Sequence, residues 1–204
     1  MASHPVPAKA NPLHPGDWIS AAFARLAAEG IEAVRVEVLA RDLGVSKGSF
    51  YWHFRDREDL LEKILARWEH DEAAWLESAV VDDPSAAARW ASLVERSASP
   101  ASLRTEVALR DWARRDPRVS ARIALVEHRR AAFIAGILRE VGFSPRAADS
   151  WSEIALLVCL GWLDRASRLP DRAPGALPPA DSFASRRSLG EFLSDLILAA
   201  SRAH

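Results

Sequence analysis

The sequence predicts an all-α protein of about nine helices, in which a small N-terminal bundle is joined by a long helix to a larger C-terminal helical domain. Three observations predict this class. Apolar residues recur with a helical period along most of the chain. Glycine and proline breaks separate the periodic stretches, as they commonly do at helix ends. Residues 41–57 place two short helical patterns on either side of a glycine, which is typical of a helix-turn-helix.

The composition of the 204-residue chain restricts the class of protein. Apolar residues make up 49% of the chain, which is ordinary for a packed globule. The formal net charge is −1, so any affinity for nucleic acid must come from local placement of charge. The chain has a single cysteine, Cys159, which excludes an internal disulfide and fits a reducing cytoplasm.

The N-terminal residues and the longest apolar stretch bear on location. Residues 1–15 contain four prolines and little that is apolar, so we expect a mobile arm rather than a signal peptide. The longest apolar stretch, residues 154–163, is far shorter than the roughly 20 residues that span a bilayer. We therefore expect a cytoplasmic protein that has no membrane partner.

Residues 16–60 are expected to form the N-terminal bundle of three helices. The first helix is predicted at residues 17–29, with Asp17 as its cap and Gly30 at its end. The second is predicted at residues 35–43. Both have an apolar stripe that can pack inside a small bundle.

A tight turn and a third helix follow. Gly44 can adopt the left-handed conformation that the turn requires, and Ser46 is a suitable N-cap for the next helix. The pattern extends this helix over residues 47–54. Phe50 and Phe54 are four residues apart, so both can pack onto the preceding helix. The second helix of a helix-turn-helix enters the major groove of DNA.

The opposite face of this helix carries the side chains that we expect to contact DNA. Lysine, hydroxyl and imidazole groups suit phosphate oxygens and base edges. We expect base-edge contacts from Lys47 and Ser49. We expect phosphate contacts from Tyr51, His53 and Arg57, whereas Trp52 either contacts DNA or packs beneath it. The full predicted set is Arg35, Ser46, Lys47, Gly48, Ser49, Tyr51, Trp52, His53 and Arg57.

Two parts of this set have simpler explanations. Arg35 either reaches a phosphate or is merely solvated. The aromatic run at residues 50–52 is more often core than contact. Spacing alone leaves DNA binding and a chance pair of helices equally open.

The residues in and around the predicted helix-turn-helix resemble those of the tetracycline-repressor (TetR) family of bacterial transcription regulators. The matching residues are Leu39-Ala40, residues 43–49, the run from Tyr51 to Phe54, and Leu60-Leu61. The chain departs from the family at Val34 and Arg35, where a threonine or serine usually supplies a cap and a phosphate contact. The resemblance implies a homodimer that binds a palindromic operator on double-stranded DNA, usually as a repressor, and that a small-molecule effector releases.

Residues 61–204 are expected to form the regulatory and dimerisation domain. The helices predicted after the bundle span residues 56–80, 84–97, 101–115, 118–141, 145–167 and 186–200, with a proline-rich loop at 170–179. The resemblance implies that the helix at residues 56–80 links an effector pocket to the DNA reader.

Five arginines gather around the predicted turn near residue 116. They are Arg110, Arg114, Arg115, Arg118 and Arg122. Such a run forms either a DNA-binding patch or a solvated face. The family offers a third interpretation, in which this turn contacts the DNA-binding bundle and relays effector occupancy.

The eight tryptophans of the chain suggest an apolar cavity. Large rings either fill the core or line a pocket for an apolar or aromatic ligand. The residues that we predict to line such a pocket are Trp68, Trp75, Trp90, Val94, Trp112, Phe133, Trp151 and Ile154.

The helix at residues 145–167 is apolar on every side in its middle. Such a helix must be buried on every side, and in a short chain one side needs a partner. Together with the helix at residues 186–200 it predicts a four-helix interface between two copies. The predicted interface residues are Leu156, Leu160, Leu163, Leu189, Phe192, Leu193 and Leu196.

No catalytic arrangement, phosphate-binding glycine loop or metal-ligand cluster is apparent in the sequence, so we expect no enzyme activity, no metal and no cofactor. Cys159 is expected to be a small buried side chain rather than a redox sensor. The predicted function is a homodimeric repressor, with an activator as one alternative. A protein of this fold that acts through a protein partner is a second alternative, and an enzyme is a third.

Overall fold

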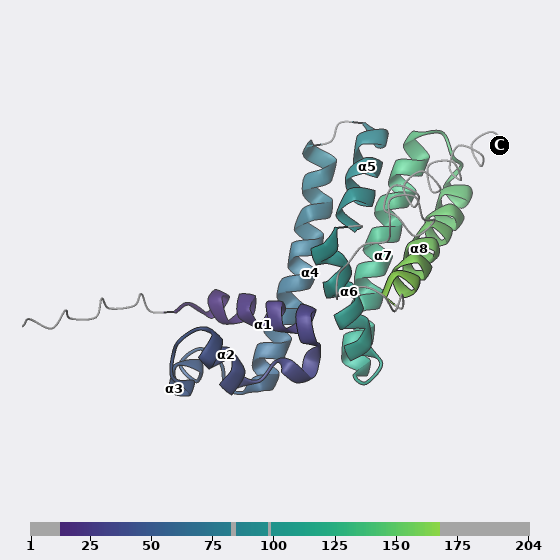
Figure 1. Ribbon diagram of the computed structural model, residues 1–204. Coiled ribbons are helices and arrows are strands. Elements are labelled where there is room, and N and C mark those ends of the chain that lie inside the picture. Colours follow the sequence, from purple (N-terminus) through teal and green to yellow (C-terminus); the bar gives the residue numbers. More distant parts are fainter. Residues whose placement is uncertain (1–12, 83–84, 98, 168–204) are drawn as a thin grey trace, which may run out of the picture.

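The computed structural model describes residues 13–82, 85–97 and 99–167, and these residues form eight α-helices and one 3-10 helix (Figure 1). The elements are α1 (Pro15–Glu29), η1 (Ile31–Ala33), α2 (Val36–Asp42), α3 (Lys47–Phe50), α4 (Arg57–Asp82), α5 (Ala86–Ser97), α6 (Pro100–Ala113), α7 (Pro117–Glu140) and α8 (Pro145–Ser167). The all-α prediction is confirmed for this part of the chain. The predicted ninth helix at 186–200, the loop at 170–179 and residues 1–12 of the predicted arm lie outside the described residues.

Helix α1 begins two residues earlier than predicted. His14 is its N-cap, and the backbone N–H of His14 donates a hydrogen bond to the Asp17 carboxylate at 2.7 Å. The prediction that Asp17 caps the helix is therefore wrong. Because Pro15 has no N–H to leave unpaired, it suits the first position of a helix, and it extends α1 backward.

The turns before α6 and α7 follow ordinary capping chemistry. The Ser99 hydroxyl accepts a hydrogen bond from the Ser102 N–H at 3.2 Å. The Asp116 carboxylate accepts one from the Arg118 N–H at 3.0 Å. Each cap precedes a proline at the first helical position, so side-chain caps and ring geometry fix where both helices start.

A short 3-10 helix that the sequence analysis did not predict follows α1. Gly30 ends α1 with φ of 82°, and the chain then forms η1 before Arg35 caps α2. This turn buries the side chains of Ile31 and Val34 in the core of the bundle. Helix α2 consequently begins at Val36, one residue later than predicted.

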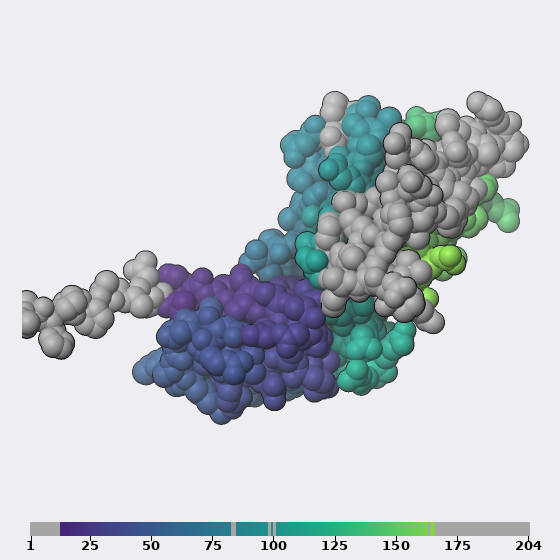
Figure 2. All heavy atoms as spheres, in the orientation of Figure 1, coloured from purple at the N-terminus to yellow at the C-terminus, as the bar shows by residue number. Residues whose placement is uncertain are grey.

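Helix α4 connects the bundle to the larger domain (Figure 1). Its 26 residues give a length of about 39 Å. Helices α1, α2 and α3 lie around one end of α4, and α5 and α7 lie along the rest of its length, with α8 on the far side of α7. In Figure 2 the bundle, coloured purple to blue, meets the teal lower end of the larger domain in a continuous surface.

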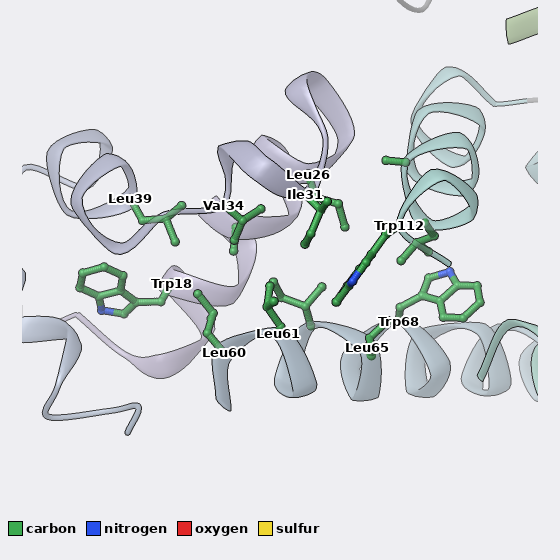
Figure 3. Close-up of a cluster of buried hydrophobic side chains, with 14 of the residues drawn as sticks. Trp18, Leu26, Ile31, Val34, Leu39, Leu60, Leu61, Leu65, Trp68 and Trp112 are labelled. Atoms are coloured by element: carbon green, nitrogen blue, oxygen red, sulfur yellow. The ribbon is translucent and has the colours of Figure 1, made fainter. Parts of the chain in front are cut away.

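One buried cluster joins the predicted bundle, residues 16–60, to the predicted regulatory domain (Figure 3). Trp112 of α6 lies beside Ile31 and extends toward Leu65 of α4. Trp112 is 6% exposed. The two parts therefore share a core, and a movement in one must be felt in the other because protein interiors are close-packed.

A second buried cluster holds the larger domain together. It consists mainly of side chains from α7 and α8, such as Leu138 and Ala155, together with Leu93 of α5. The outer face of α8 remains apolar and exposed, since Ile154 is 40% and Leu157 is 64% exposed. Along the described ranges, no helix is both long enough and apolar enough to cross a membrane.

Candidate nucleic-acid interface and effector cavity

The turn between α2 and α3 has the geometry of a helix-turn-helix. Gly44 adopts φ of 68°, as predicted. The Val45 N–H then donates a hydrogen bond to the Ala40 carbonyl at 2.9 Å, and Val45 packs against the core of the bundle. The left-handed glycine and the apolar residue after it thus set the direction in which α3 leaves the turn.

Helix α3 is shorter than the sequence pattern indicated. It spans four residues, Lys47–Phe50, and residues 51–53 form a turn. The prediction of a helix to residue 54 was wrong. Phe50 and Phe54 are buried, and their rings stack with centroids 5.1 Å apart. Apolar side chains four apart are the pattern of a helix face, and here the same pattern serves a helical turn followed by an irregular one.

Two adjacent aromatic side chains project from this turn. Trp52 is 88% exposed and Tyr51 is 56% exposed. The alternative in which Trp52 packs beneath the reader is therefore wrong. In contrast, the ring of Phe50 contacts Trp18 edge-on, with centroids 5.3 Å apart, inside the bundle. The aromatic run thus divides into one core residue and two surface residues.

The polar side chains of the predicted set lie at the same end of the bundle. Ser46 is the N-cap of α3, but its hydroxyl makes no capping hydrogen bond. Lys47 is exposed and forms an ion pair with Glu37 of α2. The hydrogen bond from Lys47 lowers the pKa of Glu37 and raises that of Lys47 itself. Arg35 is exposed at the start of α2.

Arg57 has a different role from the one predicted. Its Nε donates a hydrogen bond to the Val34 carbonyl at 2.6 Å, and its Nη2 donates one to the Ile31 carbonyl at 2.9 Å. Both acceptors belong to the segment around η1. Arg57 therefore ties the start of α4 to the bundle, and these donors are not available to a phosphate. The predicted phosphate contact of Arg57 is corrected accordingly.

The arginines around the α6–α7 turn face acidic groups of the same chain. Arg115 lies 3.3 Å from Glu32 of η1, and Arg118 lies 3.5 Å from Glu58 of α4. Arg122 contacts a third acidic group, Glu62 of α4, at 3.3 Å. This geometry favours the intramolecular interpretation of the cluster over a DNA-binding patch.

A cavity of about 260 Å³ lies between α4, α5, α6, α7 and α8, and Phe23 of α1 forms part of its wall. Of the eight residues predicted to line a pocket, Trp68 and Trp75 do so. The other six, which do not line this cavity, are Trp90, Val94, Trp112, Phe133, Trp151 and Ile154. Trp112 belongs instead to the core that joins the two parts of the chain, and Ile154 is exposed.

Helix α8 directs toward the core the face that we predicted to lie at a dimer interface. Leu156 and Leu160, which we expected at a dimer interface, line the cavity. Ile154, which we expected in the pocket, lies on the exposed face with Leu157. A helix that is apolar on every side gives no periodicity from which to choose its inner face. The side chain of Leu163 lies outside the described residues, as do the remaining predicted interface residues, Leu189, Phe192, Leu193 and Leu196.

Buried charges line the cavity, and sequence reasoning missed them. Arg130 Nη2 donates a hydrogen bond to Glu72 at 2.7 Å, and Arg96 donates one to the other oxygen of the same carboxylate at 2.8 Å. Arg130 also lies 2.5 Å from Glu106 in an ion pair without hydrogen-bond geometry at that oxygen. A signal was present in the sequence, because Glu72 falls between Trp68 and Leu76 on the apolar stripe of α4.

The protonation state of this network follows from burial and charge. Burial opposes ionisation of Glu72, but the charge and hydrogen bonds of Arg130 and Arg96 outweigh it, so the pKa of Glu72 lies below its ordinary value. Burial raises the pKa of the Cys159 thiol to about 11, so it is neutral at physiological pH. In the described ranges no three His, Cys, Asp or Glu side chains gather as a metal site.

Residues 19–64 match the sequence model of a family described as bacterial regulatory proteins, tetR family. The N-terminal bundle is a TetR-family domain. The match covers α2, the turn and α3, together with the surrounding helices of the bundle. The TetR family was the one that the helix-turn-helix residues resembled, so that prediction is confirmed.

Two curated relatives match part of the chain. The chain is 35% identical over 52 residues, or 26% of its length, to the HTH-type transcriptional regulator SrpR of Pseudomonas putida. It has the same identity, over the same number of residues, to the uncharacterized HTH-type transcriptional regulator TtgW of the same species. The matches span 24% of SrpR and 39% of TtgW, so the chain covers well under half of either relative.

Solved structures share the fold over nearly the whole chain. A transcriptional regulator from Rhodococcus sp. Rha1 has a TM-score of 0.71 and 18% identity, covering 94% of this chain and 97% of that one. A putative regulator from Saccharomonospora viridis, solved in complex with choline, has a TM-score of 0.72 and 18% identity, covering 90% and 95%. At this identity the likeness shows the fold of the chain and no more.

Proposed function

We propose that this chain is a transcriptional regulator that binds double-stranded DNA through α2 and α3 and acts as a homodimeric repressor in the bacterial cytoplasm. The observation that carries the proposal is the exposed surface of the TetR-family domain, where Tyr51 and Trp52 stand beside Lys47. Aromatic and basic groups side by side suit a surface that meets bases and phosphates.

Each polar group on this surface has a proposed role. Lys47 and Ser49 approach base edges, and Gly48 lets the backbone of α3 come close to the groove. A Cβ at Gly48 would meet only the Ser46 hydroxyl, at 3.7 Å, so the chain itself does not require glycine there. Phosphates are bound by Arg35 and by the side chains of Ser46, Tyr51 and His53. Arg57 is left out because its donors hold backbone carbonyls.

A second copy is proposed because one short helix makes few base contacts. Two copies related by a twofold axis would read half-sites about 34–36 Å apart, or at multiples of that spacing. The exposed apolar face of α8, with Ile154 and Leu157, is the described surface that best suits such an interface.

The cavity is proposed as the effector site because its wall includes part of the DNA-binding bundle. Phe23 lies on α1 and lines the cavity. One turn further along α1, Leu26 is fully buried in the cluster that contains Trp112. A ligand that displaces Phe23 would therefore move α1, and a coupling of about 1–3 kcal/mol would suffice to release DNA.

The test is an unbiased selection from a pool of random duplexes with the purified full chain. The proposal predicts enrichment of an inverted repeat. With that repeat as probe, Ser49→Ala should cost about 1–3 kcal/mol and relax the preference at one base pair. Ser150→Ala, at an exposed position of α8, is the matched control and should bind as the wild type does. Failure to enrich any sequence would contradict the proposal.

A further inference from the structure

The walls of the cavity combine aromatic rings with arginine-bound carboxylates. Phe23, Trp68 and Trp75 supply the rings. At about 260 Å³ the cavity has the volume of roughly nine water molecules. Such a space is large enough for one ring with a short substituent.

Every carboxylate that lines the cavity already has an arginine. Asp71 bonds to Arg67 at 2.7 Å, and Glu72 is held by two arginines, Arg96 and Arg130. The lining Glu106 has its ion pair with Arg130 as described above. A cationic ligand would have to displace an arginine to reach any of these carboxylates. The cavity is therefore poorly suited to cations.

The arginine Arg96 is the group that can exchange its partner. Only one of its nitrogens donates a hydrogen bond to a described residue, and its side chain is 32% exposed. Arg130 is 17% exposed and binds Glu72 through both Nε and Nη2. If Arg96 leaves Glu72, Arg130 still binds that carboxylate through two nitrogens. Glu106, which shares Arg130, keeps its second ion pair with Arg110. Arg96 can therefore bind an incoming anion without leaving the buried carboxylate of Glu72 unpaired.

The position of Arg96 also places an anion beside a ring. Its guanidinium carbon lies 4.8 Å from the centroid of Trp75. Trp75 in turn packs against Phe133, with centroids 6.0 Å apart, which fixes the ring. A ligand whose carboxylate accepts two hydrogen bonds from Arg96 would place its apolar part among Trp68, Trp75 and Phe23.

We propose that the cavity binds a small aromatic or alicyclic monocarboxylate, with Arg96 as the carboxylate-binding residue and the aromatic wall as the site of the ring. The inference deepens the proposed function, since it names the effector class of the proposed effector site. Binding to the free protein tests it without DNA, so its failure would leave the DNA-binding proposal standing.

The experiment is calorimetric titration of the full chain with three compounds of matched size: benzoate, benzamide and benzylamine. We expect benzoate to bind with at least about tenfold higher affinity than the neutral amide or the cationic amine. Choline serves as a second cationic probe and should bind no better than benzylamine. Absence of benzoate binding at millimolar concentration, or equal binding of the amide or of either cation, would overturn the proposal.

Two variants locate the site. Arg96→Gln should lower benzoate affinity about tenfold or more while leaving benzamide affinity nearly unchanged. Arg146→Gln, which removes an exposed arginine of α8 that does not line the cavity, should leave both unchanged. If Arg96→Gln folds and binds benzoate as the wild type does, the assignment of Arg96 is overturned. If that variant fails to fold, the ranking of ligands on the wild-type chain decides the question.

Discussion

At the scale of single residues, the charged groups of the cavity divide into fixed and exchangeable members. Glu72 is 9% exposed and holds two arginines from different helices. Removing one partner of a buried ion pair leaves an uncompensated charge, which costs more than the pair itself contributes. Glu72 is therefore the residue whose loss should be felt most in the stability of the larger domain.

Glu72→Gln should lower the free energy of unfolding at neutral pH by on the order of 3 kcal/mol, measured by urea denaturation. Because the pKa of Glu72 is lowered on folding from its ordinary value of 4.5, its contribution is complete above that pH. The contribution is lost as the pH falls through the lower pKa of the folded state. Below pH 4.5 the wild type should therefore lose stability more steeply than Glu72→Gln.

The control for this change is Glu77→Gln, an exposed glutamate on the same helix. Its free energy of unfolding should equal that of the wild type at neutral pH and should fall equally steeply below pH 4.5. Identical acid slopes for the wild type and Glu72→Gln would show that the buried network does not contribute in the way described.

At the scale of elements, the ends of helices were more predictable than their lengths or orientations. Gly30 and Gly44 both have positive φ and stand where the sequence placed them. Helices α6 and α7 begin at Pro100 and Pro117, each one residue before the predicted start. The length of α3 was not predictable, because buried aromatics four apart suit a continuing helix and a following turn equally.

Alanine substitutions at the two glycines of the helix-turn-helix are expected to have opposite effects on stability. Gly44→Ala should destabilise the bundle by about 1–2 kcal/mol, because φ of 68° is costly for a residue with a Cβ. Gly48→Ala should leave stability unchanged or raise it, since Gly48 is helical and a Cβ there meets only one atom, at 3.7 Å. Thermal unfolding of both variants checks this, and equal Tm values would contradict it.

The orientation of α8 shows a limit of a different kind. The sequence located this helix correctly at residues 145–167. Its apolar character on every side, however, left Leu156 and Ile154 indistinguishable. Only packing against α7 decides that Leu156 turns inward and Ile154 outward. A sequence pattern indicates which residues are apolar, but it does not indicate which neighbouring helix they pack against.

At the scale of the whole molecule, one shared core links the reader to the cavity. Trp112 packs among residues of α1, η1 and α4, although it lies far from them in the sequence. No periodicity could show that contact, so Trp112 was predicted to line a pocket. The helix-turn-helix itself was predictable because its glycine, cap and aromatic residues are contiguous.

The most direct test of the central claim is the affinity of Trp52→Ala for the selected duplex, measured by fluorescence anisotropy. Trp52 is 88% exposed, so its loss should leave Tm unchanged. Val81→Ala, at the far end of α4 and 80% exposed, is the control. We expect Trp52→Ala to bind DNA at least about tenfold more weakly while Val81→Ala binds as the wild type does. Equal affinity of Trp52→Ala and the wild type would contradict the account.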